Sequence, residues 1–227
     1  MSELVYSVRR SRRARHARVV VSADGVEVVV PERFPHWRVE PFVAAKRPWI
    51  ERTLRRYRRL AQEHPPARLH DGGEVPYLGE RMSLRVRTEP GRVRAHLARR
   101  GGELRVALGP AHDLRTELER WFRRRARAEV GSRLQAATAR AGLGYTSLQI
   151  RAQRTRWASC SSSGAMSFNW RLLLAPPEIL DYVIEHEVAH LTVHDHSDRF
   201  WSLLARRCPG YRAHERWLRD HGHRLRL

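Results

Sequence analysis

The sequence has almost no lysine, few cysteines and no long hydrophobic segment. Lys46 is the single lysine, so arginine supplies the other 43 of the 44 basic residues. The longest apolar runs, around residues 26–30 and 172–175, are far too short to span a bilayer. Arg9 and Arg10 occur before the apolar core of a signal peptide can form. These absences predict a cytoplasmic protein with no membrane partner.

The two cysteines, Cys160 and Cys208, are too few for the disulfide scaffold of a small secreted domain. They are also too far apart in the sequence for a Cys-x-x-Cys metal clip, so we expect two reduced thiols. Cys160 lies between two serines, but no base at a recognisable spacing marks it as a nucleophile. We therefore expect Cys160 to be a buried structural thiol.

Positive charge dominates the composition. The chain has 44 Lys and Arg against 24 Asp and Glu, a formal net charge of +20, which favours encounters with nucleic acids, nucleotides or acidic proteins. The arginines gather at residues 9–18, 52–59 and 120–127. Aromatic residues do not alternate with them as they would on a base-stacking platform. Nucleic acid or nucleotide is therefore a secondary expectation, and solvated helix faces explain the two later clusters equally well.

The first half of the chain has a strand-rich pattern. Apolar and polar residues alternate over residues 4–30 and predict a β-hairpin with its turn at residues 23–25. Apolar residues then recur at helical spacing over residues 37–63, a helix that Pro48 should kink or split. A connector rich in proline and glycine follows at residues 64–73. Further short strands are predicted at residues 75–78, 82–88, 92–97 and 104–108.

The second half has a mainly helical pattern. A long amphipathic helix is predicted over residues 112–140, and strands near 148–151 and 165–170 interrupt the helices that follow. The fold class is therefore α+β. We expect an antiparallel β-rich region with one helix at residues 1–110 and a helical domain at residues 111–227.

The clearest chemistry lies in the sequence His-Glu-x-x-His, formed by His186, Glu187 and His190. On a helix, a spacing of four residues places both imidazoles on one face, where they can bind zinc beside a glutamate that reaches a metal-bound water. Chance produces this motif in roughly one in twenty shuffled chains of this composition, so its context matters. Pro176 and Pro177 mark a helix start, and the histidines flank its apolar stripe.

A catalytic zinc typically has three protein ligands. We expect His196 to be the third, because Asp195 suits a turn and Ser197 suits the N-cap of a following helix, which together bring His196 back over the metal. His194 and Glu215 remain alternatives. Three imidazoles favour one Zn²⁺ per chain, although nickel or iron also suits them. Val193 replaces the glycine of a metzincin, and no methionine follows to form a Met-turn.

Five segments resemble the YgjP-like metallopeptidase family, which is related to the SprT-like and WLM proteases. They are residues 156–161 (RWASCS), 167–172 (SFNWRL), 175–178 (APPE), 186–191 (HEVAHL) and 196–201 (HSDRFW). The resemblance is specific over residues 145–218 and loose before them. It implies a zincin-like, minigluzincin-type domain with His186, His190 and His196 as ligands and Glu187 as the catalytic carboxylate. Ala158 replaces a family glycine, and its methyl group should tighten the cleft slightly.

The expected reaction is hydrolysis of a peptide or protein substrate. Zinc would activate a water whose proton Glu187 takes as general base. We expect the strand near residues 165–169 to be an edge strand that pairs with the extended substrate. The candidate substrate-binding residues are Arg156, Ser167, Asn169, Arg171 and Tyr211. The candidates for stabilising the oxyanion are Tyr211, His214 and Arg171.

Two other functions suit part of the sequence. Some proteins of the resembling family are associated with metal-dependent hydrolysis of nucleoside triphosphates such as UTP, and arginines suit phosphates. However, the chain has no Walker loop and no carboxylate cluster for Mg²⁺. The other function is association with nucleic acid, either as an adaptor with a structural metal or as an SprT-like protease.

Overall fold

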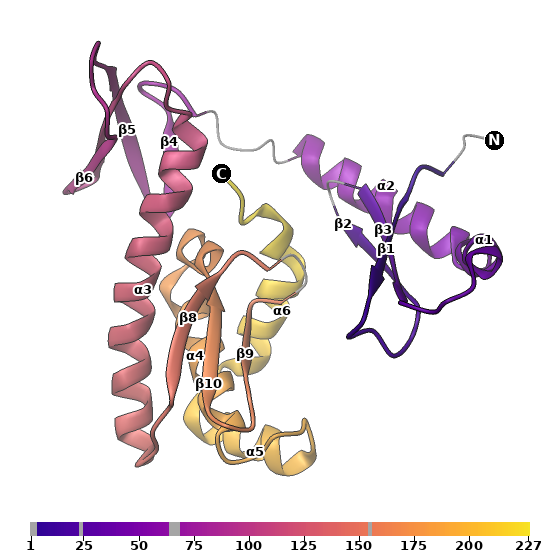
Figure 1. Ribbon diagram of the computed structural model, residues 1–227. Helices are drawn as coiled ribbons and strands as arrows, with labels where there is room; N and C mark the ends of the chain where they lie inside the picture. Colours follow the sequence, from indigo (N-terminus) through magenta and orange to yellow (C-terminus); the bar gives the residue numbers. More distant parts are fainter. Residues whose placement is uncertain (1–3, 23–24, 64–68, 154–155) are drawn as a thin grey trace. The chain divides into compact units, whose positions relative to one another are not determined.

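The computed structural model describes residues 4–22, 25–63, 69–153 and 156–227 (Figure 1). They belong to two compact units, Met1–Pro65 and Pro66–Leu227. The predicted turn at 23–25 and connector at 64–73 lie partly outside the described residues. Residues 69–110, which the sequence pattern groups with the N-terminal region, pack within the second unit.

The first unit is a three-stranded sheet with helices on one face. Strands β1 (Ser7–Ser11), β2 (Arg18–Ser22) and β3 (Gly25–Pro31) have the order β1-β3-β2. The predicted pairing of β2 with β3 is confirmed, but β1 runs parallel to β3, so the sheet is mixed. Alternate side chains of β3, from Val26, Val28 and Val30, form a core with residues of α1 (Val39–Ala44) and α2 (Arg47–Glu63).

The predicted helix over residues 37–63 is divided into three elements. A 3-10 helix, His36–Arg38, precedes α1. The helical structure is then interrupted between the end of α1 at Ala44 and the start of α2 at Arg47. Pro48 therefore lies in the first turn of α2, where its missing N–H leaves no helical hydrogen bond unmade. The division of the helix that Pro48 predicts is confirmed, and it lies just before the proline.

The second unit begins with a four-stranded sheet. Strands β4 (Glu74–Tyr77), β5 (Glu80–Thr88), β6 (His96–Arg100) and β7 (Glu103–Leu108) have the order β4-β5-β7-β6. Strands β5 and β7 are parallel, and the other pairs are antiparallel. Gly79 turns the chain between β4 and β5 with a φ of 84°. A Cβ atom at Gly79 would lie 3.2 Å from the ring of Pro177, so this turn packs closely against the start of the helix with the His-Glu-x-x-His motif.

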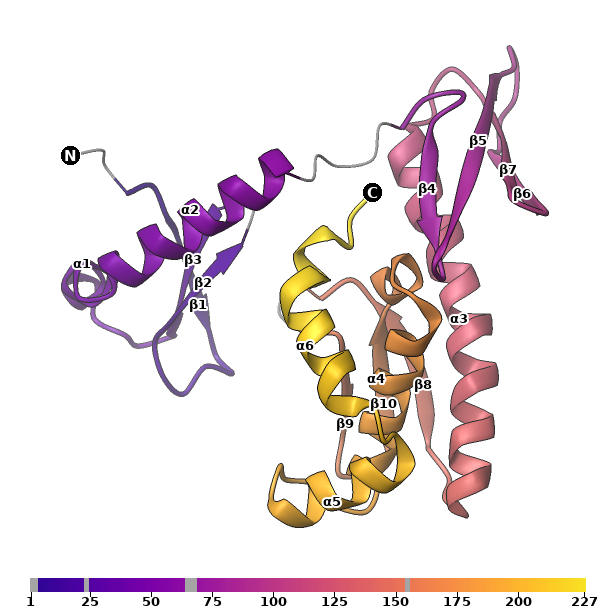
Figure 2. The same ribbon diagram turned by 180° about the vertical axis from the view of Figure 1, so that it is seen from behind.

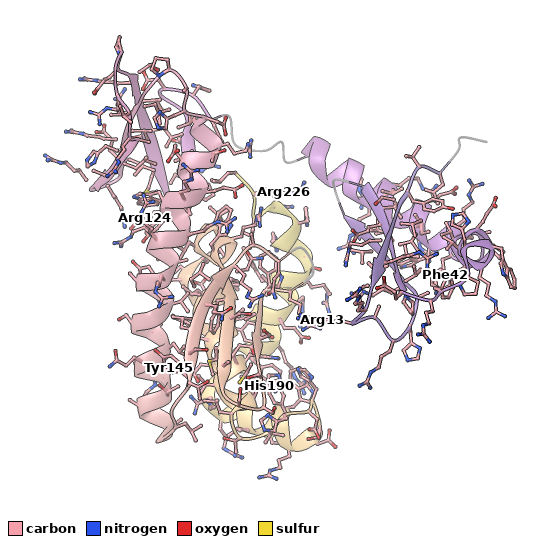
Figure 3. The ribbon with its side chains drawn as sticks, in the orientation of Figure 1. Arg13, Phe42, Arg124, Tyr145, His190 and Arg226 are labelled. Carbon is pink, nitrogen blue, oxygen red and sulfur yellow. The ribbon has the colours of Figure 1, made fainter. Side chains whose placement is uncertain are left out.

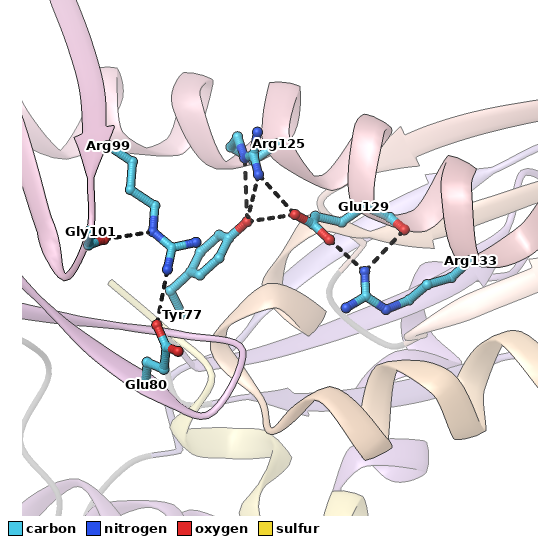
Figure 4. Close-up of polar contacts among 7 residues, drawn as sticks. All are labelled: Tyr77, Glu80, Arg99, Gly101, Arg125, Glu129 and Arg133. Carbon is cyan, nitrogen blue, oxygen red and sulfur yellow. Dashed lines mark hydrogen bonds and ion pairs between the residues drawn. The ribbon is translucent and has the colours of Figure 1, made fainter.

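The long helix predicted from the sequence is α3 (Leu114–Ala141). Asp113 caps its first turn by accepting a hydrogen bond from the main-chain N–H of Thr116 at 2.9 Å, and Gly142 ends it in the left-handed conformation. Figure 4 shows how α3 is tied to β4: Tyr77 donates to Glu129 at 3.0 Å, and Arg125 contacts both groups. Core residues of α3 such as Phe122 are fully buried.

A smaller sheet lies beside α3, as both ribbon views show (Figures 1 and 2). Its strands are β8 (Ser147–Arg151), β9 (Ala158–Cys160) and β10 (Ala165–Asn169), in the order β8-β10-β9. The prediction that residues 165–169 form an edge strand is wrong, because β10 is paired on both sides. The edge strands are β8 and β9, and β9 is the one that contacts α4. The three residues of β9 are too few for a periodic pattern in the sequence.

Three helices complete the unit: α4 (Pro177–His190), α5 (Asp198–Arg207) and α6 (Tyr211–His221). Helix α4 contacts α3, α5, α6 and β9, which explains why it is buried around most of its circumference. The α+β class is confirmed. Among the described residues, no helix combines the length and the apolar character that a membrane span requires.

Candidate metal centre

The helix α4 carries the His-Glu-x-x-His motif at its C-terminal end. Pro177 is its first residue, as the sequence predicts, and the preceding Pro176 has extended backbone angles. His190 is the last residue of the helix, so His186 and His190 lie one turn apart on the same face. Figure 3 labels His190 in the part of the unit next to α5.

The chain then turns back over the helix. Asp195 accepts a hydrogen bond from the main-chain N–H of Ser197 at 3.0 Å, which makes Asp195 the turn residue that its type predicts. Helix α5 begins at Asp198, with Ser197 at its N-cap. This geometry brings His196 next to His186, ten residues earlier in the chain.

Three imidazole nitrogens converge at this point. The Nε2 atom of His186 lies 3.2 Å from Nε2 of His190 and 3.2 Å from Nε2 of His196. All three nitrogens are within 4.8 Å of one another, and neither His194 nor Glu215 belongs to the group. Tetrahedral zinc with Zn–N bonds of about 2.0–2.1 Å would hold its nitrogens about 3.3 Å apart. The donor type, number and spacing therefore fit a zinc ion.

The protonation of the imidazoles also suits a metal. The Nδ1–H of His190 donates to the main-chain oxygen of Val193 at 2.9 Å, because a carbonyl can only accept; the Nε2 of a neutral ring then carries the lone pair. Burial, and then the neighbouring imidazoles, lower the pKa of His186 to about 3. Burial also lowers the pKa of His190. Neutral rings are the form that binds metals.

Glu187 is a buried carboxylate beside the cluster. Its side chain is on the β9 side of α4, where the main-chain N–H of Cys160 donates to it. Burial raises the pKa of Glu187 to about 7, although the hydrogen bond from Cys160 and the charge of Arg156 oppose this rise. Its Oε2 atom has no hydrogen-bond partner among the described residues. The carboxylate thus has one oxygen available for a proton transfer.

The open edge of β9 faces this carboxylate. The residues on either side of β9 are hydrogen-bonded to residues of β10. The N–H of Asn169 donates to the main-chain oxygen of Trp157 at 2.7 Å, and the N–H of Ser161 donates to that of Ala165 at 2.9 Å. In an antiparallel ladder the alternate residues point the other way. The main-chain groups of Ala158 and Cys160 therefore point away from β10, and the Cys160 N–H reaches Glu187.

A groove lies next to the third histidine. The ring of Trp201 is 5.6 Å from that of His196 and 6.3 Å from that of His186, and it stacks on Tyr211 at 5.6 Å. The groove has a volume of about 420 Å³. It is lined by Asp198, Trp201, Tyr211, Arg212, Glu215, Arg216 and Arg219.

The other candidate residues have different surroundings. Arg156 is exposed near Glu187. Ser167 is buried and hydrogen-bonded to the hydroxyl of Ser159, and Asn169 is buried and donates a hydrogen bond to the main-chain oxygen of Gln153. The guanidinium of Arg171 lies over the ring of Trp170 at 4.7 Å.

Two further candidate side chains, those of His214 and Cys160, are partly buried. His214 is half-buried, 6.1 Å from the ring of Tyr182. Cys160 is half-buried rather than buried, and burial raises the pKa of its thiol to about 11. Both cysteines are free thiols.

Sequence reasoning did not identify the strand β9 or the aromatic residues Phe200 and Trp201 as parts of the site. The signal for Phe200 and Trp201 was their position four and five residues after His196, which places them on the first turn of α5 facing the cluster.

The chain was compared with protein families, curated proteins and solved structures. A protein-family model described as "YgjP-like, metallopeptidase domain" matches residues 15–221. No curated protein matches the chain. The crystal structure of the metallopeptidase zymogen of Pyrococcus abyssi abylysin is 28% identical, with coverage of 43% of this chain and 96% of that chain and a TM-score of 0.37.

Proposed function

Because the chain belongs to the YgjP-like metallopeptidase family, we propose that it is a zinc-dependent peptidase. In this proposal His186, His190 and His196 hold one Zn²⁺ per chain, and Glu187 is the general base. The observation that carries the proposal is the convergence of three Nε2 atoms beside a buried carboxylate with a free oxygen. All of these residues belong to the unit Pro66–Leu227, which we propose as the catalytic unit.

When bound, zinc would polarise the scissile carbonyl and acidify a water molecule. Glu187 would accept the proton of the attacking water at its unpartnered Oε2 atom and pass it to the leaving amine. The hydrogen bond from the Cys160 N–H would hold the carboxylate in place during this transfer. The hydrogen bond from His190 to Val193 would keep the imidazole oriented toward the cluster.

We propose that an extended peptide pairs with the open edge of β9. The main-chain groups of Ala158 and the carbonyl of Cys160, which point away from β10, support this arrangement, since such groups on a strand edge can pair with another strand. Substrate side chains on one side of the scissile bond would enter the groove that includes Trp201 and Tyr211. Arg156, exposed near Glu187, is the cation best situated for a further contact with substrate.

Contacts from Ser167, Asn169 and Arg171 with substrate, and stabilisation of the oxyanion by Tyr211, His214 or Arg171, stay predictions. The partners nucleotide and nucleic acid, which rest on the arginine content and on the family resemblance, also stay predictions. A peptidase has peptides or proteins as its substrates, and these are the partners that the family indicates.

The proposal is tested with the intact 227-residue chain and two substrates, an unfolded protein and UTP. We expect cleavage of the unfolded protein, its loss after a chelator removes the metal, and its return on addition of one equivalent of zinc. UTP should stay intact throughout. Metal-dependent UTP hydrolysis without proteolysis would replace the proposed function with the nucleotide hydrolase, and a metal-independent rate on both substrates would contradict both.

A further inference from the structure

One aromatic side chain contacts all three histidines of the cluster. Phe200 is on the first turn of α5 and has no exposed surface. Its ring stacks on that of His190, with centroids 4.4 Å apart and planes at 25°. It meets His186 edge-on at 4.9 Å and His196 edge-on at 4.8 Å, both at 68°.

Few hydrogen bonds orient the histidines, and of the neighbouring aromatic side chains Trp201 contacts only His186 and His196. His190 has the hydrogen bond to Val193, but the Nδ1 atom of His186 is buried without a partner. Among the described residues, the one hydrogen-bond-length contact of His196 joins its Nε2 to Nε2 of His186. A metal-binding histidine is commonly oriented by a hydrogen bond from its second nitrogen. Packing must therefore orient His186 and His196.

We propose that Phe200 is a positioning residue that holds the three imidazoles with their Nε2 atoms converging, and that it thereby sets the affinity of the site for zinc. The inference rests on the proposed function, because it takes these imidazoles as the zinc ligands. The two edge-on contacts and the stacked contact restrict the ring rotations that would separate the nitrogens. A site organised before binding loses less conformational entropy when the metal arrives.

Leu204 provides a matched control. It lies one turn after Phe200 on the same helix and is also fully buried, in the same core. Its aliphatic side chain cannot make the stacked and edge-on ring contacts that Phe200 makes with the three histidines. Truncation of Leu204 should therefore loosen the core of α5 without changing the imidazole orientations.

The experiment measures zinc affinity by competition with a chromophoric chelator, using the intact metal-free chain. Phe200→Leu should weaken zinc binding by about 10- to 100-fold, the range typical of groups that orient metal ligands. The zinc affinity of Leu204→Ala should stay within about twofold of the wild-type value. Phe200→Tyr should keep most of the wild-type affinity because tyrosine retains the aromatic ring. Thermal unfolding of the metal-free proteins reports the cost to the fold separately.

The visible spectrum of the Co²⁺-loaded proteins gives a second readout, which reports the geometry of the metal ligands and does not depend on the stability of the core. Phe200→Leu should change the intensity of the tetrahedral bands, and Leu204→Ala should not. Wild-type zinc affinity in Phe200→Leu, or an equal loss in Leu204→Ala, would overturn the inference. If Phe200→Leu does not fold, an unchanged affinity and spectrum in Phe200→Met would overturn it in the same way.

The outcomes separate this inference from the proposed function. A wild-type protein that binds zinc but cleaves no peptide would contradict the proposed peptidase and leave the role of Phe200 intact. A wild-type protein that binds no zinc would contradict both.

Discussion

Glu185 and Arg207 form an ion pair that is largely closed to solvent: 2.6 Å separates the carboxylate from the guanidinium, and their side chains are 10% and 15% exposed. The other carboxylate oxygen pairs with Arg140 at 2.8 Å. Arg207 also donates to the main-chain oxygen of Ala137 at 3.1 Å. This cluster joins α3, α4 and α5 next to His186, so it ties together the two helices that flank the metal centre.

Glu185→Ala should destabilise the metal-free protein by about 3–5 kcal/mol, because it leaves the largely buried guanidinium of Arg207 without a carboxylate partner. The matched control is Glu74→Ala, which removes an ion pair with Arg81 whose side chains are 50% and 79% exposed. It should cost less than about 1 kcal/mol in unfolding free energy. Equal losses in denaturant unfolding would contradict the role assigned to the Glu185 cluster.

His196→Ala should reduce the zinc content from about one ion per chain to near zero, because two remaining imidazoles leave the site one protein ligand short. His194→Ala and Glu215→Gln should keep their zinc, since neither residue belongs to the converging group. Elemental analysis of the purified proteins measures this directly. Zinc lost in His194→Ala or Glu215→Gln but kept in His196→Ala would show that the third ligand is wrongly assigned.

Stability should depend on pH through Glu129. Burial would raise the pKa of Glu129, but hydrogen bonds from Arg133 and Tyr77 and the charges of Arg133 and Arg125 outweigh it and lower the pKa. The folded state therefore favours the ionised form. Its stabilising effect is fully present above the unfolded pKa, about 4.3, and is lost as the pH falls through the lower folded pKa.

Glu129→Gln should accordingly reduce the unfolding free energy by roughly 1–2 kcal/mol at pH 7, and the difference from wild type should shrink below about pH 4.3. Denaturant unfolding of the metal-free proteins between pH 3 and pH 7 measures both values. Glu119→Gln is the control, because Glu119 has one longer ion pair, at 3.4 Å to Arg123. A difference for Glu129→Gln that stays constant down to pH 3 would refute the linkage.

A peptide that pairs with β9 should be sensitive to N-methylation at alternate positions. An amide that donates to the main chain of Ala158 or Cys160 loses its hydrogen when methylated, whereas the next amide points away. We expect kcat/KM to fall about tenfold or more at each paired position and little at the positions between. Mass spectrometry of the cleavage products measures the rate for each methylated peptide. Rates that do not alternate along the series would exclude pairing with β9.

The cluster of three histidines was predictable because its signals are local. The spacing of His186 and His190 is a property of one helix, and Asp195 and Ser197 mark the turn and helix start that return His196 to it. The long helix α3 and the hairpin of β2 and β3 follow from periodicity in the same way.

The remaining features depend on contacts between distant segments. The three residues of β9 form a strand because β10 pairs with them, and β10 is central because β8 pairs with its other edge. The contacts of Phe200 with three imidazoles depend on how α5 packs against α4. The second unit includes residues 69–110 because the strands in this segment share a core with α3 and α4. Neither spacing nor composition indicates these relationships.

The most direct test of the account compares wild type with Glu187→Gln, measuring zinc content and cleavage of an unfolded protein in the same preparations. Glutamine keeps an oxygen that can accept the hydrogen bond of the Cys160 N–H but cannot take a proton from water. We expect an unchanged zinc content of about one per chain and a fall in cleavage rate of about 10²- to 10⁴-fold. Cleavage at the wild-type rate by zinc-loaded Glu187→Gln would contradict the account.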